Sequence, residues 1–452
     1  MSQVRVVPWV SVQPTVAEVV REVRGRVVDA EKIWVSAYVV APERMSAHAD
    51  VRVDASDAPT THAPRVTLSS PAGAALTISD WVRACVHASA HREDEAHARF
   101  AIASAPSSPV SIPPTEVRIP QRTGQVPGGH SDAAAYAFDL SPAMAGTERW
   151  CAGGAGGWLS TGTWQAAAAA AAHAAAPSPF GSTPREILSQ RRGYGVQAAQ
   201  LIAVILSTSL DMSARVFSAL DGTNPRTLTG HTRAVLCSAI LGRGRDVFTG
   251  SADGTVRRWD VGSGKSLDRI AVDAESALQS LELLPRGNDA AASESAVLLA
   301  GLRSGLVQGW DVRAPRDPVA AFAPPASDMV DVERGIDVVR AGDRSSYEVL
   351  TASRGGVCTL YDMRNLSSGH VAPLTTWCRN AAGVLDVQWH GTSATITTSD
   401  GLPYDIALDT DAPVVSAEYA GWDADPVYSA RRDTQGNLVT VGGPRVWAVY
   451  GA

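Results

Sequence analysis

The stretch Leu228–Asp260 reads LTGHTRAVLCSAILGRGRDVFTGSADGTVRRWD and contains a complete pattern of short strands and turns. Two apolar runs of strand length lie between an opening GH pair and a closing WD pair. Asp253 and Gly254 suit a tight hairpin between two strands, because glycine accepts a positive φ. Short apolar runs bounded by Gly and Asp, without a three-to-four residue period, indicate β-strands rather than helices.

The GH opening, the DG turn and the WD ending together are typical of a WD repeat, which forms one four-stranded blade of a β-propeller. One blade cannot cover its own apolar faces, so the pattern predicts neighbouring blades. Related strand–turn–strand units, most of them ending in an aromatic residue, lie near 130–165, 194–221, 229–271, 276–314, 335–366, 383–409 and 426–450. We therefore predict an all-β fold, a seven-bladed WD-repeat propeller.

The first 128 residues lack this signature, and we predict that they form a small β-rich (α+β) accessory domain with a linker before a propeller at 129–452. The domain's strand-like runs are 32–40, 49–55 and 64–70, a helical tendency marks the C-terminal end of 77–100, and the Pro/Gly-rich linker is 104–130. An alanine-rich insertion near 166–180 is expected in a loop that connects blades. The sequence leaves open which chain end closes the ring.

Composition narrows the class of protein. The chain has 452 residues, of which 45% are hydrophobic and 19% charged, as is ordinary for a globular protein. Its five cysteines are widely spaced and form no CxxC pair, so we expect a reducing compartment and neither a zinc site nor a disulfide framework. No apolar run is long enough for a bilayer and no secretion signal opens the chain, so we expect no membrane association.

Charge is distributed unevenly along the chain. The net charge of −7 argues against general nucleic-acid affinity. Residues 380–430 contain eight acidic residues and no Lys or Arg, which predicts either a solvated rim or a docking patch for a basic partner. The predicted patch consists of Asp386, Asp400, Asp405, Asp409, Asp411, Glu418, Asp423 and Asp425. Trp422 is its candidate aromatic anchor, with packing inside the propeller as the alternative.

A second set of polar residues belongs to the blade itself. His231 precedes the first strand, Ser251 lies on the second strand, Asp253 in the turn and Trp259 on the third strand. We expect a buried network from the carboxylate through the imidazole and hydroxyl to the indole N–H, because an unmatched buried donor is costly. A serine inside a sheet is no nucleophile, so these residues are predicted to be structural. No catalytic residue, metal ligand or cofactor site is predicted.

Three segments also resemble one particular family. Thr227–Leu267, Leu298–Val319 and Asp423–Thr440 are similar to the proteasomal ATPase-associated factors, which are WD-repeat assembly chaperones. The resemblance implies a non-enzymatic, monomeric chaperone of the cytoplasm and nucleus. Its implied partner is the C-terminal helical domain of an AAA ATPase subunit of the proteasome regulatory-particle base. Which subunit it binds, the affinity and the docking residues stay open.

A second function is kept beside this one. A WD-repeat propeller can equally serve as a scaffold or substrate receptor in another complex, such as a ubiquitin ligase or an RNA-processing assembly. Fold alone does not decide between these functions. A propeller enzyme is a third possibility, but the sequence contains no catalytic motif in its favour.

Overall fold

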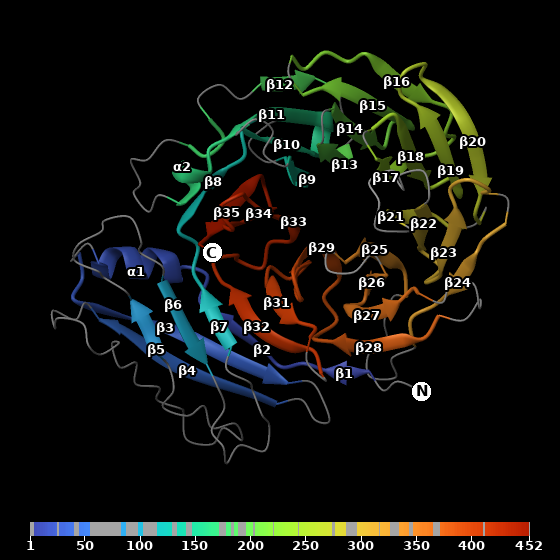
Figure 1. Ribbon diagram of the computed structural model, residues 1–452. Coiled ribbons are helices and arrows are strands. Elements are labelled where there is room, and N and C mark those ends of the chain that lie inside the picture. The colour runs from blue at the N-terminus through green and yellow to red at the C-terminus, as the bar shows by residue number, and fades with distance from the viewer. Residues whose placement is uncertain are drawn as a thin grey trace.

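Seven β-sheets follow one another around a central axis and close into a seven-bladed propeller (Figure 1). The computed structural model describes residues 4–24, 27–39, 45–54, 83–86, 98–102, 115–128, 133–141, 147–170, 178–181, 185–188, 196–201, 204–219, 221–242, 244–273, 276–285, 296–315, 317–325, 334–342, 347–364, 371–409 and 412–451. The prediction of an all-β, seven-bladed propeller is confirmed.

Each blade is an antiparallel sheet whose first strand lines the central axis and whose last strand lies at the rim. Blade 1 consists of β9 (Ala135–Leu140), β10 (Glu148–Gly154), β11 (Trp158–Trp164) and β12 (Arg185–Leu188). Blade 2 consists of β13 (Val196–Leu201), β14 (Val204–Ser209), β15 (Ser213–Ser218) and β16 (Arg226–Thr229). Blade 3 consists of β17 (Val235–Leu241), β18 (Asp246–Ser251), β19 (Thr255–Asp260) and β20 (Lys265–Ala271). Blade 4 consists of β21 (Leu278–Pro285), β22 (Ala296–Leu302), β23 (Val307–Asp311) and β24 (Ala320–Phe322). Blade 5 consists of β25 (Ile336–Ala341), β26 (Glu348–Ser353), β27 (Val357–Asp362) and β28 (Pro373–Cys378). Blade 6 consists of β29 (Val384–His390), β30 (Ser393–Thr398), β31 (Tyr404–Ala407) and β32 (Val414–Tyr419). Blade 7 consists of β33 (Val427–Arg432), β34 (Leu438–Gly442), β35 (Val446–Tyr450) and, from earlier in the sequence, β8 (Arg122–Gln125).

The second strand of each blade explains why the blades must stack. β22 reads AVLLAGL, and all seven residues are buried. A strand covered on both faces loses the apolar–polar alternation of a half-exposed strand and becomes continuously apolar. Its two faces contribute to different clusters: Leu298 packs with residues of blade 3, and Leu299 packs with residues of blade 5. Each core is therefore shared between neighbouring blades.

The ring is closed by a strand from the N-terminal side of the propeller. β8 pairs antiparallel with β35 and becomes the rim strand of blade 7, with Gly124 opposite Trp447. A Cβ on Gly124 would lie 2.9 Å from the Trp447 indole, so glycine permits this close approach. The Arg445 carbonyl accepts a hydrogen bond from the Val126 amide at 2.7 Å. Residues 122–125, which the sequence places in the linker, thus belong to the propeller.

The N-terminal region attaches to the rim through further strands. β1 (Arg5–Val6) extends blade 5 by pairing in parallel with β28, and β7 (Thr115–Arg118) extends blade 6 by pairing in parallel with β32. A separate sheet consists of β2 (Trp9–Val12), β3 (Ala30–Val39) and β4 (Met45–Asp54). Helix α1 (Val16–Arg24) contacts this sheet, and its Val16, Val19 and Val23 are buried.

Two local expectations need correction. Residues 98–100, at the end of the segment with predicted helical tendency, belong to β6 (Ala98–Ile102), which pairs with β5 (Arg83–Val86). Cross-strand pairing next to β7 overrides the local helical pattern there. The alanine-rich insertion begins as α2 (Ala166–Ala170) between β11 and β12, so it lies within blade 1 and not between blades. Residues 64–70 lie outside the described part of the chain.

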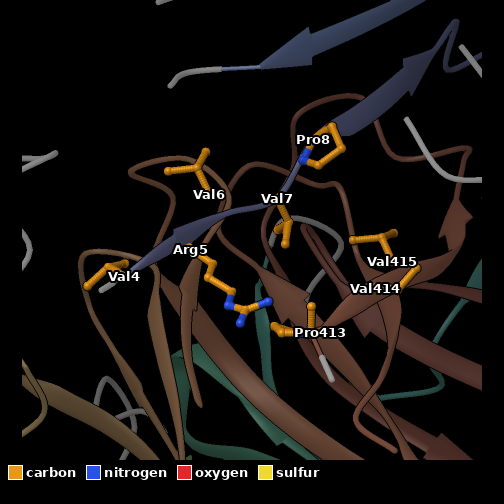
Figure 2. Close-up of a pocket in the computed structure, with 9 residues that line it drawn as sticks. Val4, Arg5, Val6, Val7, Pro8, Pro413, Val414 and Val415 are labelled. Atoms are coloured by element: carbon orange, nitrogen blue, oxygen red, sulfur yellow. The ribbon is translucent and has the colours of Figure 1, made fainter. Parts of the chain in front are cut away.

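A shallow cavity of about 480 Å³ marks the joint between the N-terminal segment and blade 6. Figure 2 shows its lining, in which Val7 and Pro8 face Val414 and Val415 while Arg5 extends towards Pro413. Apart from Arg5, this lining is aliphatic. The cavity therefore offers an apolar joint at the rim and no set of reacting groups.

Candidate functional site: the central channel and its upper mouth

The antiparallel strands divide the loops of the propeller between two faces. Here, the upper face carries the turns between the second and third strands and the loops that enter each blade. The lower face carries the other two sets of loops. The first strand of every blade begins at the upper face and runs down the channel, so early residues of that strand lie near the upper opening.

The blade 3 network is closed, but through a different hydroxyl from the one expected. The Trp259 indole N–H donates to Thr249 Oγ1 at 2.8 Å, and this hydroxyl lies 2.8 Å from His231 Nε2. His231 Nδ1 lies 3.0 Å from Asp253 Oδ2. Ser251 instead donates to the Arg233 carbonyl at 3.1 Å and accepts from the Asp253 amide. Thr249 takes the predicted place of Ser251, because it lies two residues further inside β18 on the same face.

The protonation states of His231 and Asp253 determine which of the two donates the hydrogen bond between them. Burial lowers the pKa of His231, so the imidazole is neutral at pH 7 and its Nδ1–H donates to Asp253. Burial opposes ionisation of Asp253, but hydrogen bonds from Thr255, Thr232 and His231 outweigh it and lower the pKa to about 2. Each polar group has a partner, and the network is structural.

Replacing Thr249 with valine is expected to lower the free energy of unfolding by about 1–3 kcal/mol, because the Trp259 N–H and His231 Nε2 then lose their shared partner inside the core. Thr351 is the equivalent residue of blade 5 and donates a 3.4 Å hydrogen bond to the Thr359 carbonyl. Thr351→Val is therefore the matched control, with a smaller expected loss. Thermal unfolding of both variants measures the difference, and equal losses would contradict this account.

The channel contains a chain of ion pairs that links five consecutive blades. Arg340 lies 3.5 Å from Glu282 and 3.0 Å from Asp386. Arg431 lies 2.5 Å from the other oxygen of Asp386 and 2.8 Å from Asp139. Negative and positive groups thus alternate over β21, β25, β29, β33 and β9. This row of ion pairs, called the ion-pair chain below, crosses the seam between blades 7 and 1 and so helps to hold the ring closed on its inner side.

Burial and the neighbouring arginines act in opposite directions on these carboxyl groups. Burial opposes ionisation of Asp386, but Arg431 and Arg340 outweigh it and hold its pKa below the ordinary value. Glu282 has one arginine at a longer distance, so burial dominates and raises its pKa to about 7. Asp386 is therefore the ionised centre of the ion-pair chain, whereas Glu282, at its end, is only partly ionised near pH 7.

The predicted acidic docking patch is wrong for three of its eight carboxylates, which are buried, and for Trp422 the alternative of packing inside the propeller is confirmed. Asp386 lies in the channel, and Asp405 accepts hydrogen bonds from Thr395 and Tyr419 inside blade 6. Glu418 forms an internal ion pair, and Trp422 packs in the core of blade 7. Asp405 and Glu418 are internal because β31 and β32 pair on both sides, whereas Asp386 faces the channel from the inner strand β29. Each of these buried carboxylates lies beside an arginine.

The remaining members do not all share one surface: Asp400, Asp423 and Asp425 lie on the upper face, and Asp409 does not. Asp400 is partly buried in the upper turn of blade 6, where it accepts hydrogen bonds from Thr398 and Asn380. Asp423 is exposed and Asp425 partly exposed, both in the upper loop that enters blade 7, whereas the exposed Asp409 lies on the lower face. Asp411 lies outside the described residues. The eight acidic residues are therefore divided between the interior and both faces.

Glu418 instead joins the N-terminal segment to the propeller. Its carboxylate lies 2.8 Å from Arg379 and accepts the Val10 amide N–H at 3.1 Å. The Arg379 guanidinium also lies over the Tyr404 ring at 4.6 Å. Burial raises the pKa of Glu418 to about 7, although Arg379 opposes this. One carboxylate thus connects blade 6, the loop after blade 5 and β2.

The upper mouth of the channel is the surface that draws one residue from every blade. The second residue of each inner strand lines a cavity of about 470 Å³: Tyr136, Gln197, Leu236, Gln279, Asp337, Leu385 and Tyr428. In all seven blades the pairing register shifts at this residue, which is a β-bulge. Bulges redirect a side chain out of the ladder and are common beside functional sites.

The mouth combines apolar and polar groups. Tyr136 and Tyr428 stack edge to face at 5.2 Å across the closing seam. Asp337 and Arg354 form a bidentate ion pair at 2.9 and 3.1 Å. Leu210, from the upper turn of blade 2, completes the lining. An apolar surface with a few fixed polar groups is suited to binding a partner.

The buried cysteines of the propeller are poorly suited to covalent chemistry. Burial raises the pKa values of the Cys151, Cys237 and Cys358 thiols, which keeps them protonated and poorly nucleophilic. Within the described residues, no group of three His, Cys, Asp or Glu is arranged to hold a metal ion. No helix in this part of the chain has the length and apolarity of a membrane span.

Neither the ion-pair chain nor the mouth was predicted from the sequence. A usable signal for the chain was an arginine inside a short apolar strand, as at Arg340 and Arg431. The turn of blade 2 also differs visibly from that of blade 3, with LDM at 210–212 where the latter has ADG at 252–254. Neither signal shows by itself that residues from five or seven blades meet.

Comparisons with known proteins agree with the repeat. The WD domain, G-beta repeat family matches residues 222–260, which cover most of blade 3. A ribosome biogenesis protein WDR12 homolog of Arabidopsis thaliana is 30% identical over 147 residues, or 32% of this chain and 30% of that protein. Subunit I of eukaryotic translation initiation factor 3 from Danio rerio is 38% identical over 64 residues, or 14% of this chain and 20% of that protein. The chain thus spans less than a third of each relative.

Proposed function

We propose, from the premise that this chain is a WD-repeat propeller protein, that it is a non-enzymatic assembly factor which docks a partner protein on its upper mouth. One observation carries the proposal: the seven bulge residues and Leu210 form an opening that combines leucine and tyrosine side chains with a few polar groups. The charged groups below it are paired with one another in the ion-pair chain. The channel interior is thereby stabilised, while the mouth stays accessible for binding.

We propose further that the partner is the C-terminal helical domain of an AAA ATPase subunit of the proteasome base. Support comes from the three segments that resemble proteasomal ATPase-associated factors. Under this proposal the protein is a monomer of the cytoplasm and nucleus and assists regulatory-particle assembly. Capture by a C-terminal acidic patch is not part of the proposal, because its members are buried or dispersed.

The second candidate is a scaffold in another complex, and the two relatives favour it. Their names refer to ribosome biogenesis and to translation initiation. A propeller can present the same mouth to subunits of such assemblies, or of a ubiquitin ligase or RNA-processing assembly. The identity of the partner separates these candidates.

Affinity purification of the tagged full-length chain from its own cells tests the proposal. We expect base ATPase subunits to be recovered in near-equal amounts with the chain, and to be lost with the double variant Leu236→Ser and Leu385→Ser. Leu374→Ser, at an exposed rim position, is the matched control and should retain them. Recovery of pre-ribosomal, initiation-factor or ligase subunits instead would favour the scaffold. Recovery unaffected by the double variant would refute docking at the mouth.

A further inference from the structure

The upper turn of blade 2 has a backbone conformation that its residue type disfavours. Met212 has a φ of 68°, in the left-handed region that favours glycine. The equivalent turns of blades 3 to 6 use glycine there: Gly254, Gly305, Gly356 and Gly401. Met212 is thus a large side chain kept at a position that costs conformational energy, which is a feature of functional sites.

Blade 7 provides an instructive contrast. Arg445 occupies the equivalent position with a φ of 61°, but its side chain is buried and donates to the Gly128 carbonyl beside the closing strand. Its backbone strain therefore has a structural explanation. The Met212 side chain is 46% exposed, and Leu210 in the same turn is 39% exposed. Packing within the propeller does not account for these two residues.

The turn is fixed so that these side chains point outwards. The carboxylate of Asp211 accepts the Ser213 amide at 3.1 Å and the Ser213 hydroxyl at 2.5 Å. Its other oxygen lies 2.9 Å from Arg215. Asp211 therefore anchors the turn, while Leu210 contributes to the lining of the mouth and Met212, two residues further on, is exposed. The apolar pair is preorganised, which lowers the entropy lost on binding.

We propose that Leu210 and Met212 form an apolar anchor that receives a large, uncharged side chain from an extended segment of the partner. This inference rests on the proposed docking at the upper mouth. The charge at the mouth argues for that occupant, because Asp337 and Arg354 neutralise each other. Gln197 and Gln279 place side-chain amides on the ring, where they suit the backbone groups of an extended chain.

Met212→Gly separates binding from folding. Glycine accepts a φ of 68° without strain, so this variant should unfold at the same temperature as the natural chain or higher. The probe is a phage-displayed library of linear peptides, panned on the immobilised full-length protein. Enriched peptides, synthesised with a fluorophore, should contain an uncharged stretch with Leu, Met, Phe or Trp. We expect Met212→Gly and Leu210→Ser each to raise their Kd by at least about tenfold.

Leu374→Ser, on β28, is the matched control and should leave the Kd unchanged. The anchor is refuted if panning enriches no peptide, or if enriched peptides bind Met212→Gly as tightly as the natural chain. Purified C-terminal domains of the base ATPase subunits form a separate arm. If none binds while the peptides do, the proteasome assignment fails and the anchor stands. A domain that binds both forms of the chain equally upholds the assignment and refutes the anchor.

Discussion

Replacing Asp386 with alanine is expected to lower the free energy of unfolding by about 3–5 kcal/mol, because the change leaves two partly buried arginines without their shared, buried carboxylate. Asp386 is 4% exposed and contacts Arg340 at 3.0 Å and Arg431 at 2.5 Å. Breaking one side of a buried ion pair costs more than the pair contributed, since the remaining charge stays desolvated. The measurement is chemical or thermal unfolding of the full-length variant at about pH 7.

Asp423→Ala is the matched control, because it removes an exposed carboxylate from the same acidic segment of the sequence. Its expected effect lies within about 0.5 kcal/mol. If Asp386→Ala does not fold in solution, Asp386→Asn keeps the shape of the side chain and should still lose stability. A variant that unfolds like the natural chain but no longer captures its partner would restore Asp386 as a docking residue.

Replacing Arg379 with alanine is expected to cost about 3–5 kcal/mol for the same reason, and to loosen the N-terminal segment as well. The guanidinium is 3% exposed and lies 2.8 Å from Glu418, whose carboxylate also holds the Val10 amide. Arg313→Ala serves as the control, since Arg313 pairs with Asp311 at the surface, where ion pairs contribute little. Thermal unfolding reports the global loss, and amide exchange at Val10 reports the local one.

The loss in Arg379→Ala should depend on pH. The folded pKa of Glu418, about 7, is raised above the ordinary value of 4.5, so folding favours the protonated carboxyl group. Its contribution to stability is full below about pH 4.5 and is lost as the pH rises through 7. Without Arg379 the buried carboxylate has no cation, so the deficit should grow between about pH 5 and pH 8. A deficit that is constant over this range would argue against Glu418 as its cause.

Short sequence motifs were enough to predict the strands of the blades, but not the contacts that the side chains on those strands make. The GH, DG and WD pairs of blade 3 predicted its strands because hairpin geometry is local. The choice of Thr249 over Ser251 depends on how far each residue lies inside β18, which a one-residue shift of register would change. His231 and Asp253 were found because loop and turn residues have little positional freedom once the strands are known.

The acidic segment illustrates the limit of counting charges along a chain. Asp386 and Asp423 look alike in the sequence, yet the first is on a strand that lines the channel and the second is in an upper loop. Which side chains face the axis depends on all seven blades being assembled. The arginines that neutralise Asp386 come from β25 and β33, which belong to the blades on either side of its own. Only the closed ring brings them together.

The closing strand has a consequence for biosynthesis. The Arg445 side chain donates to the carbonyl of Gly128, 317 positions earlier, and β8 pairs with β35 of blade 7. A nascent polypeptide cannot form this junction until β35 has left the ribosome. Until then, β8 lacks its partner strand and blade 1 lacks one of its two neighbouring blades. Premature termination even within the last blade should therefore yield an unclosed product, prone to capture by quality-control machinery.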